Sequence, residues 1–545
     1  MSRVRGTAAL LLFGICAVLT LWSAGGPSHP GPLDVSSQIR AILTSARAAD
    51  FDIRQIDLKS LREFYANTAF KPVWAGRGAT SPVMLAALAH AAEDGLDPAQ
   101  YHSADDLLRG HASTPLQAAE FDILLTDGAL KFARDLRKGR PDLRTIDRDI
   151  DLPLDPFDPS AALARALQAD QLDAFLAGLE PPQPDYARLK GALRRYRTIA
   201  AEGGWPSLPA AGAELFADDQ TLSSLLRRRL VYEDAAAQSD AEVPDAVKRF
   251  QQHHGLKSDG RVGPQTLAAL NEPASQRALE IAANMERWRW VPRAFEKSYV
   301  LVNVPAAQLD LVADNKIILT SSVIVGRRKG PTPILRAMAS SVTINPPWNV
   351  PASIARREIL PKLKSDPSYL ASKNMVLLNG PADDPSGVHI DWNAISALHF
   401  PYVIQQLPGP ANALGQIKLE LPNRFSVYLH DTPAKDAFDL NERYLSHGCV
   451  RVEKIRELAS YALDGDVASG APELDAAIAA GTTRHLALNA PLPIYLLYWT
   501  VFVDEDGTVE FRKDIYGRDR RLLDAIAKHA PRQQVTFNLP PCRPA

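Results

Sequence analysis

Two short stretches decide the fold of this chain and the chemistry it carries: Tyr428-Leu429-His430-Asp431-Thr432 and Ser446-His447-Gly448-Cys449-Val450-Arg451. The first ends an alternating run that predicts a strand, which would place His430 at a strand end. A thiol at its ordinary pKa of about 8.5 is only a few per cent thiolate at neutral pH, and a neighbouring imidazole makes it reactive. Cys449 is therefore a candidate nucleophile, with His430 or His447 as its base.

The residues around Cys449 suit attack on a carbonyl group. Gly448 lets the backbone approach a substrate closely, and its N–H and that of Cys449 can point into an oxyanion hole. Arg451 can hold a carboxylate or carbonyl group by a forked contact. Two other interpretations stay open. A lone buried cysteine is more often a small hydrophobic residue than a nucleophile. A zinc site is the other, although one cysteine and two histidines leave it one ligand short.

Outward from these stretches, the sequence alternates with a period of two from Ser298 onward, so we predict a mostly β domain over residues 298–482. The predicted strands are 299–304, 308–312, 317–325, 342–345 and 425–430. Between the last two lies the segment 352–421, which contains a helical stretch at 354–363 and several Pro/Gly turns. Long excursions from a sheet are often lids, so we expect this insertion to cover the site.

Two helical regions are predicted before the β domain. Residues 34–212 carry apolar residues at helical spacing, interrupted by a Pro/Asp-rich stretch, and show no chemical motif. Residues 219–273 form a compact unit in which Gly255 ends one helix and Gly263-Pro264 begins the next. The predicted fold class is therefore multidomain α+β. The last part, 483–545, contains an alternating run and is expected to pack on the β domain, without an assigned role.

Composition narrows the class of protein. A length of 545 residues predicts two to four domains, and 46% hydrophobic with 23% charged residues is ordinary for a globular chain. The net charge of −2 gives no reason to expect a nucleic-acid partner. The three cysteines, Cys16, Cys449 and Cys542, form no CxxC pair, and we predict neither a disulfide framework nor a metal or cofactor site.

The N-terminus is typical of an export signal. Arg3 and Arg5 precede an apolar run at 8–22, and small, helix-breaking residues follow at 23–27. This run is shorter than the roughly 20 residues that span a membrane. We therefore expect residues 1–26 to be a signal peptide cleaved near Ala24, with an uncleaved membrane anchor as the alternative. The body of the protein would then work in the periplasm or elsewhere in the cell envelope.

His430 followed by Ser446-His447-Gly448-Cys449-Val450-Arg451 resembles the signature of L,D-transpeptidases with a YkuD-type catalytic domain, which are penicillin-insensitive enzymes that cross-link peptidoglycan. Residues 246–267 resemble the helical peptidoglycan-binding module of bacterial wall enzymes. Further stretches resemble the large YcbB-type subgroup: 285–290, 301–305, 330–333, 345–351, 408–415 and 428–433. The resemblance implies a helical scaffold, a peptidoglycan-binding module and a catalytic domain with an inserted capping segment, in this order.

The resemblance also implies a role for each matching residue. Cys449 would attack the carbonyl of the third residue, a diamino acid, in a donor tetrapeptide, so that D-alanine leaves and a thioester forms. His430 would be the base, oriented by a backbone carbonyl rather than by the Asp431 side chain. His447, Gly448 and Cys449 would line the oxyanion site. The candidate substrate-binding residues are Arg451, Ser446, Tyr428, Trp348 and Asp431, and no metal or cofactor is needed.

The implied activity is L,D-transpeptidation, in which an acceptor amine resolves the thioester into a 3→3 cross-link and carbapenems acylate Cys449. The implied partners are donor and acceptor stem peptides, with a membrane tether and other cell-wall enzymes as further candidates. Water, a free D-amino acid or a protein lysine as acceptor would instead make an L,D-carboxypeptidase, an exchange enzyme or a lipoprotein-anchoring enzyme. A non-catalytic peptidoglycan-binding scaffold is the remaining alternative.

Overall fold

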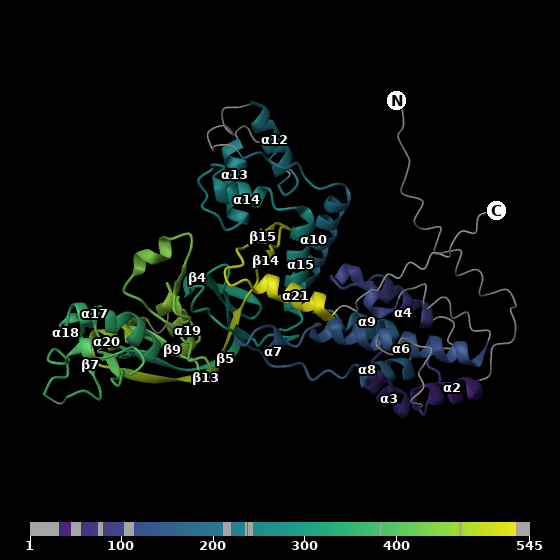
Figure 1. Cartoon of the computed structure of the whole chain (residues 1–545), viewed down its shortest axis with the longest axis horizontal. Coiled ribbons are helices and arrows are strands. Elements are labelled where there is room, and N and C mark those ends of the chain that lie inside the picture. Colours follow the sequence, from purple (N-terminus) through teal and green to yellow (C-terminus); the bar gives the residue numbers. More distant parts are fainter. Residues whose placement is uncertain are drawn as a thin grey trace. The chain divides into compact units, whose positions relative to one another are not determined.

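The structure is a computed structural model that describes residues 32–44, 56–74, 80–102, 114–210, 220–234, 237, 243–381, 383–467 and 471–529. The predicted signal segment, Cys16 and Cys542 lie outside these residues. The described residues divide into two compact units (Figure 1), one within 32–140 and 156–180, the other within 141–155 and 181–529. None of the described helices is both long and apolar enough to cross a membrane.

The described part of the first unit is helical. Its elements are α2 (Pro32–Thr44), α3 (Leu58–Asn67), α4 (Thr80–Ala89), η2 (Ala91–Asp94), η3 (Pro98–Tyr101), α6 (Pro115–Lys138), α8 (Pro159–Gln168) and α9 (Leu172–Ala177). The long helix α6 packs against α2, α3, α4 and α8. Its buried Asp122 accepts hydrogen bonds from the N–H groups of Val73 and Trp74 and from the Tyr65 hydroxyl. This carboxylate is satisfied inside the unit, which fits a structural role.

The second unit begins with helices. These are α7 (Leu143–Ile146), α10 (Pro184–Ala201), α12 (Gln220–Leu230), α13 (Val243–His253), α14 (Pro264–Leu270) and α15 (Ala274–Trp288). Helices α12, α13 and α14 share a small apolar core that includes Leu226, Val247 and Phe250. They form the predicted compact unit, hereafter the helical module. Helix α10, which falls within the predicted helical region 34–212, packs against α15 and lies in the second compact unit.

A sheet of ten strands forms the main part of the second unit. Its strands are β1 (Ile150–Asp151), β2 (Ser298–Asn303), β3 (Gln308–Ala313), β4 (Lys316–Gly326), β5 (Ile334–Ile344), β9 (Ile417–Glu420), β10 (Leu429–His430), β11 (Tyr444–Ser446), β12 (Val450–Val452) and β13 (Arg484–Leu497). The order runs β1-β5-β13-β2-β3-β4-β12-β10-β9, with β11 paired to β4 beside this path. Strand β9 also pairs with β5, so the pairing closes on itself. Helices α19 (Ile455–Asp464) and α20 (Ala471–Ala479) pack against β13 and β5, and η7 (Lys435–Asp439) against β4.

Two details of the predicted β domain need correction. Strand β13 lies between β5 and β2, so the predicted boundary at residue 482 cuts through the sheet. The predicted strand 425–430 is reduced to β10, because the Asn423 side-chain oxygen accepts the N–H groups of Phe425 and Val427. Ser426 adopts a left-handed φ of +54° within this tight turn, so the backbone there cannot pair as a strand.

Most of the predicted insertion (352–421) is a small subdomain with its own core, hereafter the capping segment (residues 352–416), whereas β9 at its end belongs to the large sheet. It contains α16 (Ala352–Ile354), the π-helical turn η5 (Ala355–Ile359), α17 (Leu360–Ser365), α18 (Tyr369–Ser372), β7 (Met375–Leu377), η6 (Trp392–Ala394) and β8 (Ile404–Gln406). Strands β7 and β8 form a three-stranded sheet with β6 (Trp348–Asn349). Leu363, Trp392 and Ile404 lie in its apolar core.

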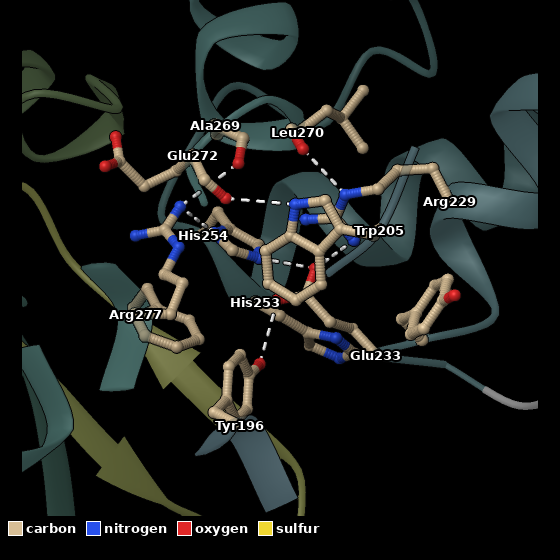
Figure 2. Close-up of polar contacts among 12 residues, drawn as sticks. Tyr196, Trp205, Arg229, Glu233, His253, His254, Ala269, Leu270, Glu272 and Arg277 are labelled. Carbon is tan, nitrogen blue, oxygen red and sulfur yellow. Dashed lines mark hydrogen bonds and ion pairs between the residues drawn. The ribbon is translucent and has the colours of Figure 1, made fainter. Parts of the chain in front are cut away.

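The C-terminal extension joins the helical module to the sheet. It comprises a hairpin, β14 (Val501–Val503) with β15 (Val509–Phe511), and α21 (Arg518–His529), which packs on α15 and α7. At the junction, the His254 ring of the module stacks 3.9 Å from Phe250 and 5.1 Å from Phe511. Glu233 accepts a hydrogen bond from the Tyr196 hydroxyl and lies 3.5 Å from His254 (Figure 2).

Candidate active site

Four side chains of the predicted site lie on one face of two neighbouring parallel strands: Tyr428, His430, Cys449 and Arg451. Strand β10 pairs with β12 so that His430 is opposite Arg451 and Leu429 is opposite Val450. The Val450 N–H also donates to the Tyr428 carbonyl at 3.1 Å, which continues the register to Tyr428 and Cys449. Because side chains alternate along a strand, the register brings the candidate nucleophile and the candidate base to the same face.

His430 is oriented by a backbone carbonyl. Its Nδ1 lies 2.5 Å from the Asp431 carbonyl oxygen, which only accepts, so Nδ1 carries the proton and Nε2 keeps a lone pair. Burial, with the positive charge of Arg451 as a further cause, lowers the pKa of His430 to about 3. The ring is therefore neutral at pH 7, and no hydrogen bond joins it to Cys449 within the described structure. A proton can thus pass to Nε2 when the substrate brings the groups together.

The Asp431 side chain is directed to other partners. Its carboxylate accepts a hydrogen bond from the Gln416 N–H at 2.9 Å and forms an ion pair with Lys435 at 2.5 Å. The residue is buried, with 7% of its surface exposed. The structure thus brings the backbone carbonyl of Asp431 to His430 and pairs its carboxylate with Gln416 and Lys435.

Cys449 is a free thiol that donates a weak hydrogen bond to the Ser426 carbonyl at 4.0 Å. The Tyr428 hydroxyl lies near its sulfur, and the Trp348 indole lies near that hydroxyl. Burial raises the pKa of Cys449, while the hydrogen bonds from Tyr428 and the charges of Lys418 and Arg451 act in the opposite direction. The thiol is therefore protonated at rest, with groups in place that favour the thiolate once a base removes the proton.

The turn before Cys449 holds its own backbone by side-chain hydroxyls. The Ser446 hydroxyl donates to the Cys449 carbonyl at 2.6 Å and accepts the Gly448 N–H at 3.1 Å. Gly448 has a φ of +127°, which L side chains rarely adopt. The Gly448 N–H is thus already used, whereas the Cys449 N–H has no acceptor within the described chain. Of the two N–H groups predicted for an oxyanion hole, only that of Cys449 remains available in this conformation.

Two cations border the site. The Arg451 Nε is buried and has no hydrogen-bond partner in the described structure, and burial lowers the pKa of this guanidinium. Lys418 lies opposite His430 on β9, with its Nζ 4.2 Å from the centre of the Tyr428 ring. Sequence reasoning missed Lys418, because only the pairing of β9 with β10 brings it to the site.

His447 contacts the capping segment. Its Nε2 lies 2.6 Å from the Glu358 carboxylate and 2.6 Å from an Arg327 guanidinium nitrogen, and Arg327 contacts the same Glu358 oxygen at 2.7 Å. His447 has no hydrogen bond to Cys449 in the described structure. The geometry thus leaves His430 as the better-placed base. Among the described residues, no three His, Cys, Asp or Glu side chains are grouped to hold a metal ion.

Comparison with known families assigns three parts of the chain. Residues 297–469 match the model described as L,D-transpeptidase catalytic domain, residues 218–270 the "Putative peptidoglycan binding domain", and residues 59–193 the "Scaffold domain". These matches confirm the multidomain α+β fold class and the family resemblance seen in the sequence motifs.

Similar proteins carry the same family name. A Haemophilus influenzae protein named "Putative L,D-transpeptidase" is 35% identical over 243 residues, which are 45% of this chain and 48% of the relative. The match thus spans about half the length of that curated relative. A solved L,D-transpeptidase from Mycobacterium smegmatis matches at 13% identity and a TM-score of 0.17, over 37% of this chain and 58% of the other. One from Xylanimonas cellulosilytica matches at 17% identity and a TM-score of 0.18, over 54% and 98%.

Proposed function

This chain contains an L,D-transpeptidase catalytic domain preceded by a peptidoglycan-binding domain, and we propose that it forms 3→3 peptidoglycan cross-links through a thioester on Cys449. The observation that carries the proposal is the strand register that puts Cys449 and His430 on one face, with the His430 Nδ1 proton held by a backbone carbonyl. This arrangement supports a neutral base poised beside a protonated thiol.

In the first half-reaction, His430 Nε2 takes the proton of Cys449, and the sulfur attacks the carbonyl carbon of the third residue of a tetrapeptide stem. The negative charge that develops on the carbonyl oxygen is stabilised by a hydrogen bond from the Cys449 N–H. The C–N bond to D-alanine then breaks, and its amine takes the proton from His430. The products are free D-alanine and a thioester on Cys449.

In the second half-reaction, the side-chain amine of a neighbouring stem attacks the thioester. It loses a proton to His430, the new amide forms, and Cys449 leaves as the thiol. Peptidoglycan stems carry carboxylates, which suits the unpaired Arg451 Nε and the nearby Lys418. Trp348 and Tyr428 would line the donor side of the site, since Tyr428 lies near Cys449 and Trp348 lies near Tyr428.

Peptidoglycan lies outside the cytoplasmic membrane, so the proposal includes export and activity in the periplasm. The basic, apolar and small-residue pattern of 1–26 supports a signal peptide or an anchor. A carbapenem would acylate Cys449, and intact-protein mass spectrometry would show one adduct that is absent from a Cys449→Ala variant.

The decisive experiment uses tetrapeptide-rich sacculi and mass analysis of the muropeptides. Incubation with the wild-type protein is expected to give 3→3 dimers and free D-alanine, and Cys449→Ala to give neither. Tripeptides without dimers would identify a carboxypeptidase instead, and incorporation of added D-amino acids an exchange enzyme. If the wild-type protein binds the sacculi but changes no muropeptide, the non-catalytic scaffold is the better description.

A further inference from the structure

The C-terminal extension reaches the turn that carries Cys449 through buried hydrogen bonds. The Tyr516 hydroxyl donates to the Gly326 carbonyl at 2.5 Å and accepts the Thr332 N–H at 3.1 Å. The Arg518 guanidinium donates to the Thr332 carbonyl at 3.0 Å. Thr332 is fully buried, and Tyr516 and Arg518 expose only 7% and 3% of their surface. Both backbone polar groups of Thr332 are therefore held by the extension.

The Thr332 hydroxyl connects these contacts to the turn that carries Cys449. It donates to the Gly448 carbonyl at 2.8 Å and accepts the Gly326 N–H at 2.9 Å. The Ser446 hydroxyl holds the next carbonyl, that of Cys449. Thus the two carbonyl groups on either side of the Cys449 α-carbon are each fixed by a hydroxyl group.

Fixing the Gly448 carbonyl also sets the direction of the Cys449 N–H. The two groups belong to one peptide unit, and in a trans peptide the C=O and N–H point to opposite sides. No cis peptide occurs within the described chain. Because Thr332 holds the carbonyl, the Cys449 N–H points away from the 326–332 loop, and it has no acceptor among the described residues. This is the N–H that the proposed mechanism uses for the oxyanion.

The 326–332 loop has no room to relax against the turn. A Cβ at Gly330 would lie 3.2 Å from the His447 carbonyl oxygen, and a Cβ at Gly326 would lie 2.2 Å from the Gly330 carbonyl oxygen. Arg518 is itself anchored, because its Nε donates to the Asp147 carboxylate at 2.9 Å. The path from the extension to the turn is therefore short, buried and closely packed.

We propose that Thr332 is a positioning residue that aims the Cys449 N–H at the substrate oxyanion, and that Tyr516 and Arg518 hold Thr332 for this task. The inference rests on the proposed acyl transfer at Cys449. It assigns to the C-terminal extension a role in the rate of acylation, which no sequence motif indicated.

The test compares two reagents on the full chain. p-Nitrophenyl acetate acylates a thiol through a tetrahedral oxyanion, whereas iodoacetamide alkylates it by displacement at a saturated carbon, where no oxyanion forms. In Thr332→Val, we expect acylation to slow by about tenfold or more and alkylation to change by less than about twofold. Thr332→Ser retains the hydroxyl and is expected to recover most of the acylation rate.

Tyr516→Phe tests the contribution of the extension without removing a ring. We expect its acylation to slow severalfold, again with little change in alkylation. Tyr461→Phe is the matched control, because it loses one hydroxyl hydrogen bond, to Ser298 at 2.8 Å, away from the turn. Its ratio of acylation to alkylation should equal that of the wild-type protein.

An unchanged ratio of acylation to alkylation in both Thr332→Val and Tyr516→Phe would overturn the proposal. This covers equal slowing of both reactions, which would show a merely structural role, and no slowing of either. If Thr332→Val does not fold, the ratio in Tyr516→Phe decides. A wild-type protein that reacts with the ester but leaves muropeptides unchanged would refute the proposed function alone, because the ratio of the two rates is measured without peptidoglycan.

Discussion

Glu358 Oε1 lies 2.6 Å from His447 Nε2, so the capping segment is hydrogen-bonded to the turn that carries Cys449. Arg327, from the loop next to that turn, contacts the same oxygen at 2.7 Å. Burial acts to raise the pKa of Glu358, but the hydrogen bonds from His447 and Arg327 outweigh it and hold the pKa below its ordinary value. The Glu358 carboxylate is therefore ionised at neutral pH, and the contact connects the capping segment to the turn that carries Cys449.

Glu358→Gln should loosen this contact and expose Cys449. We expect alkylation by iodoacetamide to speed up by less than about fivefold, because a half-exposed ion pair contributes roughly 1 kcal/mol or less. The measurement is the alkylation rate at neutral pH. Glu442→Gln is the control, since it breaks an exposed ion pair with Lys513 instead. An unchanged or slower rate in Glu358→Gln would contradict the prediction.

The pH dependence of Cys449 reactivity should distinguish a neutral pair from an ion pair. Burial raises the pKa of Cys449, and His430 has a pKa of about 3, so both groups are uncharged at pH 7. The alkylation rate should therefore rise with pH in a single step, whose midpoint lies above the ordinary thiol pKa of about 8.5. A shoulder between pH 4 and 7, which a preformed thiolate–imidazolium pair would give, would refute this picture.

Tyr428→Phe should make the Cys449 thiolate harder to form. The variant removes the Tyr428 hydroxyl, which acts to lower the pKa of the Cys449 thiol, so this pKa should rise further. We expect acylation at neutral pH to slow by roughly tenfold, which is about the value of one hydrogen bond to a charged group. Tyr495→Phe, whose hydroxyl donates to Glu296 at 2.8 Å, should react like the wild-type protein. Equal rates in all three proteins would show that Tyr428 only packs.

The junction between the helical module and the hairpin should be acid-sensitive. Burial lowers the pKa of His254 to about 4, against an opposite effect of Glu233, so the unfolded chain binds a proton at a higher pH than the folded one. The stability that this neutral residue contributes is present above about pH 6.5 and is lost as pH falls toward 4. Chemical unfolding at pH 7 and pH 5 measures the loss.

His254→Gln cannot take up this proton. The variant should lose less stability than the wild-type protein between the two pH values, by about 1–2 kcal/mol. Any contribution of the buried His430 is common to both proteins and cancels. If the two proteins lose the same free energy of unfolding, His254 is not the source of acid sensitivity.

The strands between residues 298 and 326 could be predicted from sequence because period-two patterning is local, whereas only the end of β5 was predicted. The role of β13 could not, since Pro491 and Pro493 lack N–H groups and argue against a central strand. In the structure Pro491 falls in a register shift between Ala487 and Leu492 where β13 pairs with β5, and Pro493 lies opposite Met338. A bulge of this kind leaves no signature in a single sequence.

By itself, the sequence determined the order of helical regions, helical module and sheet, and it identified His430 and Cys449 as the candidate base and nucleophile. These features follow from periodicity and short motifs, which depend on neighbouring residues along the chain. Only the tertiary structure decided that His447 contacts Glu358 and that Lys418 borders the site. It alone brought Thr332 to Gly448 and Tyr516 to Thr332, because hydrogen bonds across more than a hundred residues depend on how whole segments pack.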